Sequence, residues 1–463
     1  MICLSYLNAK QRADNTKECA MKTEHFDTII VGSGTSAYYA LEALASHQKV
    51  AVVAPEPLGG VCALKGCQPK KYLVAHQEAR NAIKDLLGHG FETMPKSSWA
   101  ALQSLKNAFT ASVPHRTRKT LQSKARFIEG IATFCAPDAL RVGEKTLSAK
   151  HIVIATGSLP RRNAIKGSEH LRTSEDVLEM PSLPKRIAFV GAGVIAFEFA
   201  YVAASLGSEV TVVHRSNQPL KGFDESMVAR FLSATKEAGI RVITNAPVTE
   251  VTKQGATYTL ITEEGLHVKA DAVFETIGRM PNLSVLEGDA GSVQASAKGI
   301  AVNAHMQSVS NPHVYAIGDC TDTPYQLATV ADEQGKIAGE NILKGNHRTW
   351  DGALVAHAMF THPPLVAVGI TEEEAREKGL DYAIKEGETA SWPSSKRIGE
   401  THGAYKMVLS KEGTLLGATL LRHNSPEVIN LCAMLLKTKM PIATFKQMAL
   451  AYPTASSDLK NML

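Results

Sequence analysis

Two cysteines separated by four residues are the first candidates for chemistry in this chain. Cys62 and Cys67 lie in the run PLGGVCALKGCQPKKYL. In a regular helix, residues at this spacing differ by about 7.5 Å in rise alone, whereas a disulfide requires Cα atoms within about 7 Å. Pairing these cysteines therefore requires a distorted turn. Gly59, Gly60 and Gly66 give the backbone enough conformational freedom to form such a turn.

A helix is predicted to begin near Lys70, directly after this pair. Pro69 restricts the conformation of the residue before it, and a helix N-terminus together with the ammonium group of Lys70 favours a thiolate. We therefore interpret the pair as redox-active. Two alternatives remain: a zinc site, for which no CxxC or CxxH partner lies nearby, and two buried structural cysteines. Three further cysteines lie among apolar or small residues and are predicted to pack: Cys135, Cys320 and Cys432.

A strand–glycine–helix unit near the N-terminus predicts a dinucleotide site. In FDTIIVGSGTSAYYALEALASHQKVAVVAPE, Gly32, Gly34 and Ala37 follow a β-branched run at G-x-G-x-x-[GA] spacing. The first glycine allows a tight turn, the second lets backbone N–H groups approach a pyrophosphate, and the small third residue lets the helix pack closely. The acid that usually ends the next strand is missing. Ala54 stands there, and Glu56 is the candidate for the ribose.

The same pattern recurs in KRIAFVGAGVIAFEFAYVAASLGSEVTVVHRSN. Gly191, Gly193 and Ala196 repeat the spacing between a short apolar strand and an apolar helix. Two such units predict two bound nucleotides. The economical interpretation is one flavin and one nicotinamide, with electrons passing between them.

The second unit also carries a signal for the type of nicotinamide nucleotide. Its second strand ends in His214 and Arg215, with no carboxylate at the ribose position, and Lys221 follows. A carboxylate there would bind a free 2′-hydroxyl and repel a 2′-phosphate, so its absence favours NADPH over NADH. The alternative is that Arg215 and Lys221 are solvated surface cations.

Taken together, these motifs resemble the class I FAD-dependent pyridine nucleotide–disulfide oxidoreductases, which include glutathione reductase, dihydrolipoamide dehydrogenase and mercuric reductase. The resemblance covers about residues 23–463. It implies an α/β fold with two Rossmann-like dinucleotide-binding domains and a C-terminal α+β dimerisation domain. The expected boundaries are a polar extension at 1–22, a split FAD domain at 23–160 and 282–350, an NAD(P) domain at 161–281, and a dimerisation domain at 351–463.

The resemblance implies roles for individual residues. Cys62 resembles the interchange thiol that attacks the acceptor, and Cys67 resembles the thiol that lies against the flavin. Lys70 and Glu198 resemble the ion pair beside flavin N5, and Asp319 resembles the residue that binds the ribityl chain. The other positions implied in cofactor binding are Gly32, Gly34, Ala37, Glu56, Gly60, Thr156, Gly157, Gly191, Gly193, Arg215, Lys221, Gly278 and Gly318.

The C-terminus departs from the family's pattern. Its disulfide reductases usually end with His-Pro-Thr and a Glu five residues after the His. This chain reads AYPTASSDLKNML, so Tyr452 replaces the His and Ser457 replaces the Glu. A histidine with a pKa of about 6.5 exchanges protons at neutral pH, whereas a tyrosine with a pKa of about 10 is a poor base that can donate a hydrogen bond.

Three interpretations of this departure remain. The pKa of Tyr452 is tuned or Tyr452 acts only as an acid, or another group such as His423 or Asp458 reaches the thiols, or the acceptor does not need this protonation. Mercuric reductases also lack the His–Glu arrangement, but this chain lacks their C-terminal cysteine pair as well, so mercury is not favoured.

The resemblance implies a homodimeric flavoenzyme. It would pass electrons from NADPH through FAD to a Cys62–Cys67 disulfide, and then to a disulfide or other small-molecule acceptor. A reductase of quinones or metal ions is one alternative, and a flavoprotein redox sensor with little turnover is another. The missing His–Glu pair favours the sensor, whereas the retained cysteines, Lys70 and Glu198 count against it.

Length and composition agree with a soluble enzyme of several domains. The 463 residues correspond to about three domains, and hydrophobic and charged fractions of 44% and 21% are ordinary for globular proteins. The formal net charge of +5 is too small to predict a nucleic-acid partner.

We expect no membrane segment, because no apolar run reaches about 18 residues. Polar residues interrupt any signal sequence in 1–22, so the expected compartment is the cytoplasm.

Overall fold

The computed structural model describes residues 23–352 and 354–463. The predicted polar extension lies outside the described residues. The chain divides into two compact units. The first contains residues up to Pro69, Asn107–Leu159 and Arg279–Gly352, and the second contains Lys70–Lys106, Pro160–Gly278 and Ala353–Leu463. The boundary falls within two long helices, α4 (Cys67–Asp85) and α5 (Trp99–Lys124).

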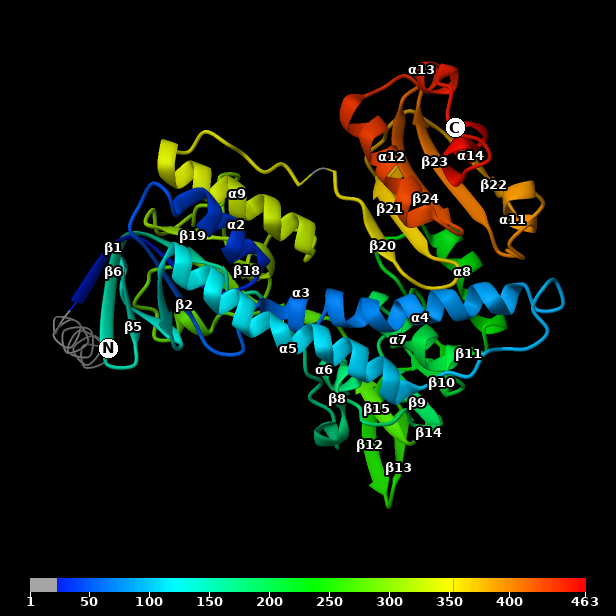
Figure 1. The fold of residues 1–463 in the computed structure, drawn as a ribbon, viewed down its shortest axis with the longest axis horizontal. Coiled ribbons are helices and arrows are strands. Elements are labelled where there is room, and N and C mark those ends of the chain that lie inside the picture. The colour runs from blue at the N-terminus through cyan, green and yellow to red at the C-terminus, as the bar shows by residue number, and fades with distance from the viewer. Residues whose placement is uncertain (1–22, 353) are drawn as a thin grey trace. The chain divides into compact units, whose positions relative to one another are not determined.

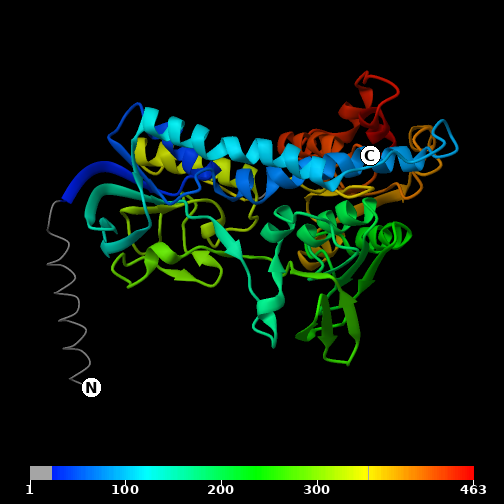
Figure 2. The ribbon, with the colours of Figure 1, turned by 60° about the horizontal axis from the view of Figure 1, so that its bottom comes forward.

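The first unit is built on a sheet with strand order β3-β2-β1-β6-β5-β4, in which β19 also pairs with β6. The contacts among β3, β2, β1, β6 and β19 are parallel. Alternate residues of β1 enter different cores: Ile29 and Val31 pack on one face, and Ile30 packs on the other with α2 and α9. These two helices lie side by side (Figures 1 and 2). The main elements are β1 (Thr23–Val31), α2 (Thr35–Leu44), β2 (Val50–Ala54), α3 (Gly60–Leu64), β3 (Arg126–Glu129), β4 (Ala132–Ala136), β5 (Ala139–Val142), β6 (Lys145–Ile154), β16 (Arg279–Pro281), β17 (Ala295–Ser296), β18 (Gly299–Ile300), β19 (Val314–Ala316) and α9 (Ala328–Lys344).

The second unit contains another parallel sheet, with strand order β11-β10-β9-β15-β8. Helix α7 is apolar nearly all round, and its buried apolar side chains belong to the core that also holds Phe189 and Phe274. A small antiparallel sheet, β12-β13-β14, lies in the chain between β11 and β15 of the parallel sheet. The elements are β8 (Arg172–Thr173), α6 (Ser174–Leu178), β9 (Arg186–Val190), α7 (Val194–Ser205), β10 (Glu209–Val213), α8 (Glu225–Glu237), β11 (Ile240–Ile243), β12 (Val248–Gln254), β13 (Thr257–Thr262), β14 (His267–Ala270) and β15 (Ala272–Glu275).

The C-terminal part of the second unit is an antiparallel sheet with order β20-β21-β24-β23-β22. Helices α12 and α14 bury apolar side chains against it, in a core that includes Val428, Cys432 and Leu459. The elements are β20 (His357–Met359), β21 (Leu365–Gly369), α10 (Glu372–Glu377), β22 (Tyr382–Glu388), α11 (Pro393–Lys396), β23 (Ala404–Ser410), β24 (Leu415–Leu421), α12 (Ser425–Thr438), α13 (Ile442–Gln447) and α14 (Ala455–Met462).

The predicted fold class is confirmed: the chain contains two Rossmann-like parallel sheets and a C-terminal α+β region. The predicted domain boundaries stay a prediction, because the second unit holds both the second parallel sheet and the C-terminal region. None of the helices in the described residues combines the length and apolar character needed to cross a membrane.

Candidate redox and nucleotide sites

The first glycine turn joins β1 to α2. Gly32 has φ +132°, and a Cβ there would lie 2.2 Å from the carbonyl oxygen of Ala155, so only glycine fits. Gly34 is the N-cap of α2 and provides no side chain to bind the amides of the first turn. Ala37 is buried, which lets the helix approach the sheet. The turn therefore leaves backbone donors and a positive helix end for an anion, as the pyrophosphate of FAD requires.

A second backbone segment comes very close to this turn. A Cβ on Gly60, where φ is +73°, would lie 2.5 Å from the Cα of Gly34. The N–H of Gly59 also donates to Oγ of Ser33 at 3.2 Å. These contacts hold the start of α3, which carries Cys62, beside the glycine turn. The predicted cofactor residue Gly60 therefore lies with Gly32 and Gly34, and the cradle fits a flavin nucleotide.

Glu56 takes part in local contacts that the sequence did not indicate. Its Oε2 accepts a hydrogen bond from the N–H of Leu58 at 2.9 Å. Its Oε1 pairs with Arg118 at 2.5 Å, and the same guanidinium also contacts Glu129 at 2.8 Å. That Glu56 binds the ribose of the first nucleotide stays a prediction.

Asp319 is held by a chain of polar contacts that the sequence did not reveal. Oγ of Ser158 donates to its Oδ2 at 2.8 Å, and the guanidinium of Arg279 donates to Oγ of Ser158 at 2.9 Å and to its carbonyl oxygen at 2.8 Å. The neighbouring Gly318 has φ +71° and donates its N–H to Gln334 at 2.7 Å. Asp319 therefore has a fixed orientation in the first unit.

Two segments that carry implied cofactor-binding residues, 155–157 and 278–282, are hydrogen-bonded to each other. Thr156 donates its hydroxyl to the carbonyl oxygen of Asn282 at 2.6 Å, and the N–H of Asn282 donates to the carbonyl oxygen of Gly157 at 2.8 Å. Gly157 and Gly278 both have positive φ, +69° and +103°. The segments that leave and re-enter the first unit thus meet near the elements that carry Asp319.

The helix is interrupted between the two cysteines. Helix α3 ends at Leu64, and α4 begins at Cys67. A Cβ on Gly66 would lie 3.1 Å from the carbonyl oxygen of Val61, so the turn is compact. Cys62 is partly buried and Cys67 is exposed, and no disulfide joins them in this structure.

The two thiols are hydrogen-bonded, and this bond is the main reason why the pKa of Cys62 is raised. Burial raises it further, as do the charges of Asp332 and Asp319. A donated hydrogen bond stabilises the protonated form, so this contact favours the protonated form of Cys62. A reaction that uses Cys62 as nucleophile must therefore include the removal of that proton.

In the second unit, the carboxylate of Glu198 is almost completely buried and is bound on both oxygens. Lys70 forms an ion pair with its Oε2. Its Oε1 lies 3.6 Å from Nζ of Lys71 and accepts the N–H of Phe360 at 2.9 Å. Lys71 also lies over the ring of Phe360, and burial lowers the pKa of Lys71 to about 8. The predicted Lys70–Glu198 pair thus has a second cation, for which the Lys-Lys doublet was the only sequence signal.

The second glycine turn repeats the geometry of the first. Gly191 has φ +103°, and a Cβ there would lie 2.7 Å from the carbonyl oxygen of Thr276. Gly193 is the N-cap of α7 without a side-chain cap, and Ala196 is fully buried. The predicted cations Arg215 and Lys221 are both exposed in the loop that follows β10.

The C-terminal segment exposes the residue that replaces the family's histidine. The side chain of Tyr452 is 83% exposed. Thr454 begins α14 by accepting the N–H of Ser457 at 3.1 Å. Asp458 pairs with the buried guanidinium of Arg422 at 2.9 Å. Within this chain, Asp458 is therefore already neutralised by a cation, whereas Tyr452 is accessible.

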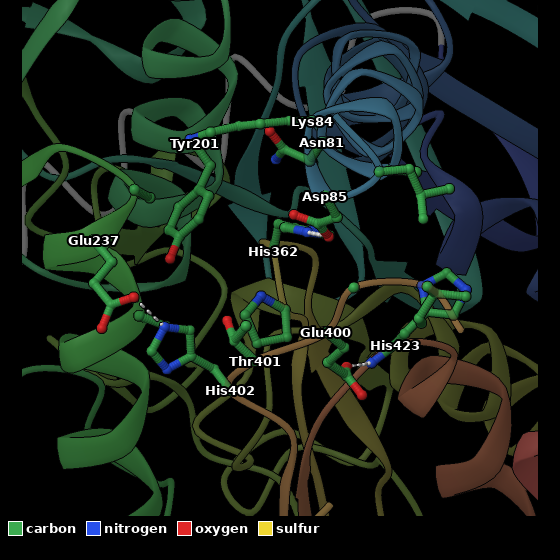
Figure 3. Close-up of a pocket in the computed structure, with 17 residues that line it drawn as sticks. Asn81, Lys84, Asp85, Tyr201, Glu237, His362, Glu400, Thr401, His402 and His423 are labelled. Carbon is green, nitrogen blue, oxygen red and sulfur yellow. Dashed lines mark hydrogen bonds and ion pairs between the residues drawn. The ribbon is translucent and has the colours of Figure 1, made fainter. Parts of the chain in front are cut away.

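His423 lines a cavity of about 370 Å³ in the second unit. Two imidazole–carboxylate pairs surround this cavity, His362 with Asp85 at 2.6 Å and His402 with Glu237 at 2.8 Å (Figure 3). Glu400 accepts the backbone N–H of His423. Burial, opposed in part by Glu400, lowers the pKa of His423. Roles of His423, Asp458 and Tyr452 in proton transfer stay predictions.

Comparison with known proteins gives matches along the whole described chain. Residues 26–335 match the family model described as pyridine nucleotide-disulphide oxidoreductase, and residues 355–463 match the model of its dimerisation domain. Glutathione reductase from Nostoc sp. is 29% identical, with 95% of this chain and 100% of that protein covered. A mercuric reductase from Lysinibacillus sphaericus is also 29% identical, with 94% and 82% covered. The dihydrolipoyl dehydrogenase of Mycoplasma pneumoniae is 28% identical, with 95% and 98% covered.

The fold is shared with a solved structure of lower identity. The HOCl-induced flavoprotein disulfide reductase RclA from Escherichia coli superposes with a TM-score of 0.85 at 23% identity. The superposition covers 94% of this chain and 99% of the other.

Proposed function

This chain belongs to the pyridine nucleotide–disulphide oxidoreductase family of FAD-dependent enzymes, and on that premise we propose that it transfers electrons from NADPH to Cys62–Cys67 and then to a disulfide or another small acceptor. The observation that carries the proposal is the interrupted helix between the cysteines, which lets their thiols meet. The close approach of Gly60 to Gly34 places this pair beside a turn suited to a flavin nucleotide.

The residues that would hold the flavin are those of the first unit. Gly32, Gly34 and Gly60 leave room for a pyrophosphate, and Asp319, fixed by Ser158, is available for the ribityl chain. When bound, FAD supplies the two-electron step between a nicotinamide and a disulfide. The buried Lys70–Glu198 ion pair of the second unit is the remaining pair that the resemblance assigns to the flavin. Because residues 355–463 match a dimerisation domain, we propose that the working form is a homodimer.

The thiol chemistry proposed for this chain is a balanced exchange. The sulfur of Cys62, after losing its proton, attacks one sulfur of the acceptor disulfide, which releases one thiol and leaves a mixed disulfide on Cys62. Cys67 then attacks the sulfur of Cys62 and releases the second thiol. The products are two thiols and a Cys62–Cys67 disulfide, so two electrons have moved from the chain to the acceptor.

The nicotinamide nucleotide is proposed to be NADPH. Arg215 and Lys221 are exposed on the loop after β10, and His214 occupies the position at which a carboxylate would favour NADH. Exposed cations at this position are available to a 2′-phosphate.

One observation favours a second candidate function. Tyr452 is a weak replacement for a neutral-pH base, while Cys62 keeps its proton. Acceptors that take electrons without needing that base, such as quinones or metal ions, would suit this arrangement. Among the relatives is a mercuric reductase, and RclA has also been described as a Cu(II) complex.

An anaerobic titration of the purified flavoprotein with NADPH tests the proposal. The first two electrons are expected to produce a broad long-wavelength absorption band, because the Cys67 thiolate then lies against oxidised flavin. Direct bleaching of the flavin by those electrons would contradict a dithiol relay. Steady-state rates with oxidised glutathione, lipoamide, coenzyme A disulfide, quinones and metal ions then identify the acceptor class. Reduction by NADPH without turnover of any acceptor would favour a redox sensor.

A further inference from the structure

The loop after β10 is bonded back to the second glycine turn at both of its ends. The N–H of Leu220 donates to the carbonyl oxygen of Ala192 at 3.0 Å. The N–H of Ala192 in turn lies 3.3 Å from Nδ1 of His214. Ala192 is the residue between the two glycines of the turn. One residue of the turn therefore anchors the loop at His214 and again at Leu220.

The candidate cations sit next to these two anchor points. Arg215 follows His214 directly, and Lys221 follows Leu220 directly. Closing the loop onto the glycine turn thus fixes the backbone from which both cations extend. The backbone of His214 is also held from β11 and the residues after it, because its N–H donates to the carbonyl oxygen of Ile243 at 2.7 Å and its carbonyl oxygen accepts the N–H of Ala246 at 2.8 Å. The bond from Ala192 to the ring adds a direct tie between the glycine turn and the loop.

The partners of His214 define its protonation state. The backbone N–H of Ala192 can only donate, so Nδ1 accepts. The carbonyl oxygen of Gln218, 3.2 Å from Nε2, can only accept, so Nε2 carries the hydrogen. Oγ of Ser216, 3.0 Å from Nε2, accepts a share of the same hydrogen. Both ring nitrogens are satisfied only when the imidazole is neutral.

We propose that His214 is a positioning residue for coenzyme recognition, whose neutral ring holds loop 214–220 on the glycine turn so that Arg215 and Lys221 are presented to a 2′-phosphate. A carboxylate at this position could accept the same N–H, but its charge would repel the phosphate. A neutral imidazole makes the bond without the charge. This inference rests on the proposed use of NADPH and adds the residue that organises its specificity.

The charged surroundings of His214 agree with a neutral ring. Burial is the main cause that lowers the pKa of His214, and the positive charges of Arg215 and Lys221 act in the same direction. The carbonyl of Gln218 opposes them in part. From α8, Glu225 faces this loop through a 2.7 Å hydrogen bond from the amide of Gln218. Protonation of Nδ1 would remove the acceptor for Ala192 and so break the direct tie between the ring and the glycine turn.

Coenzyme binding to the oxidised FAD-loaded protein tests this role without turnover. Dissociation constants of NADP⁺ and NAD⁺ are measured by calorimetry for the wild type, His214→Leu and His214→Asn. Asn keeps an uncharged acceptor near the position of Nδ1, whereas Leu removes it. We expect the preference for NADP⁺ over NAD⁺ to fall about tenfold in His214→Leu, equivalent to about 1.4 kcal/mol, and to stay within about threefold of the wild type in His214→Asn.

Three results separate this inference from the proposed function. Equal affinity of the wild type for NADP⁺ and NAD⁺ would contradict the NADPH preference and this role together. A wild-type preference that survives unchanged in His214→Leu would contradict the role of His214 alone. If neither nucleotide bound to His214→Leu although its flavin spectrum and melting temperature were native, His214 would support the whole turn instead of its specificity, and the inference would be wrong.

The pH dependence of binding distinguishes a positioning residue from a direct phosphate ligand. The 2′-phosphate of NADP⁺ gains a proton as pH falls, which changes its affinity in every variant. The pH dependence measured with His214→Asn, which has no imidazole, therefore serves as the baseline. If neutral His214 closes the loop, NADP⁺ affinity should fall more steeply in the wild type than in His214→Asn between pH 7.5 and about 5.5. If protonated His214 bound the phosphate directly, the wild type would fall less steeply, and equal slopes would mean that the ring has no role.

Discussion

Glu198 and Lys70 form an ion pair that solvent barely reaches, with side-chain exposures of 2% and 13%. The pair joins the helix that begins at Cys67 to α7, the helix of the second glycine turn. Lys71 and the N–H of Phe360 occupy the other carboxylate oxygen. Taking one partner away therefore leaves a buried charge with incomplete compensation, which is costlier than losing a surface ion pair.

Replacing Lys70 with Met should destabilise the protein. The loss of one partner of a buried pair costs about 3–5 kcal/mol, and Lys71 should reduce this, so we expect a decrease of about 2–4 kcal/mol in the free energy of unfolding. Urea denaturation followed by circular dichroism measures it. Lys166→Met is the matched control, because the exposed Lys166 side chain pairs with the partly exposed Glu250 at 2.7 Å, and such a pair should contribute less than about 1 kcal/mol. Equal losses in both variants would refute a structural role for the buried pair.

The turns of both nucleotide units could be predicted from sequence because their glycines have no substitute. At Gly32 and Gly191 a side chain would collide with a carbonyl oxygen at the end of a strand far away in the sequence. Only glycine is compatible with such a contact, so the glycine itself indicates the turn. At the break between Cys62 and Cys67, a Cβ on Gly66 would lie 3.1 Å from the carbonyl oxygen of Val61, so glycine is favoured there but not required. Local constraints of this kind can be recognised from the spacing of glycines in the sequence.

Contacts between polar side chains could not be predicted from the sequence in this way. Lys71 reaches Glu198 only because α4 and α7 pack together within the second unit, and Ser158 reaches Asp319 from a segment far away in the chain. The bond between His214 and Ala192 likewise depends on how the loop after β10 folds back. Many residue types are compatible with each position until the packing is known.

The two cysteines should be separable by trapping the covalent intermediate. In Cys67→Ser the resolving thiol is missing, so a disulfide acceptor should leave one half attached to Cys62, detectable as a mass increase in the intact protein. Cys62→Ser should show no such adduct and no disulfide turnover, while it still binds FAD. Cys67→Ser without an adduct at Cys62, or unchanged turnover in Cys62→Ser, would rule out Cys62 as the interchange thiol.

His423 should make the protein less stable in acid. Burial holds its pKa below the ordinary value of about 6.5, so the unfolded chain binds more protons and stability falls as pH drops below that value. His423→Gln should therefore show a shallower loss of melting temperature between pH 6.5 and 5 than the wild type. His89→Gln, which alters an exposed histidine, serves as control and should keep the wild-type slope. If the melting temperature of His423→Gln fell with pH as steeply as that of the wild type, His423 would not contribute to the loss of stability in acid.

Restoring a histidine at position 452 should show whether proton removal limits the reaction. The hydrogen bond to Cys67 and burial raise the pKa of Cys62, so the thiolate fraction increases with pH, and the wild-type rate with a disulfide acceptor should rise from pH 6 to pH 9. In Tyr452→His the new base can take the proton near neutral pH. General base catalysis contributes about 10²–10⁴-fold when well placed, and we expect about a tenfold gain in kcat/KM at pH 7 with a flatter pH profile.

The matched variant is Tyr452→Phe, which keeps the ring but can neither donate nor accept a proton. If Tyr452 donates to the departing thiol, Tyr452→Phe should lower kcat without changing the pH at which Cys62 ionises. If the residue takes no part in the reaction, Tyr452→Phe should match the wild type at every pH. A rate for Tyr452→His no higher than that of Tyr452→Phe would show that position 452 does not reach the thiols. The proton of Cys62 would then have to leave through another group, and His423→Gln, measured with the same acceptor, would be the next variant to compare.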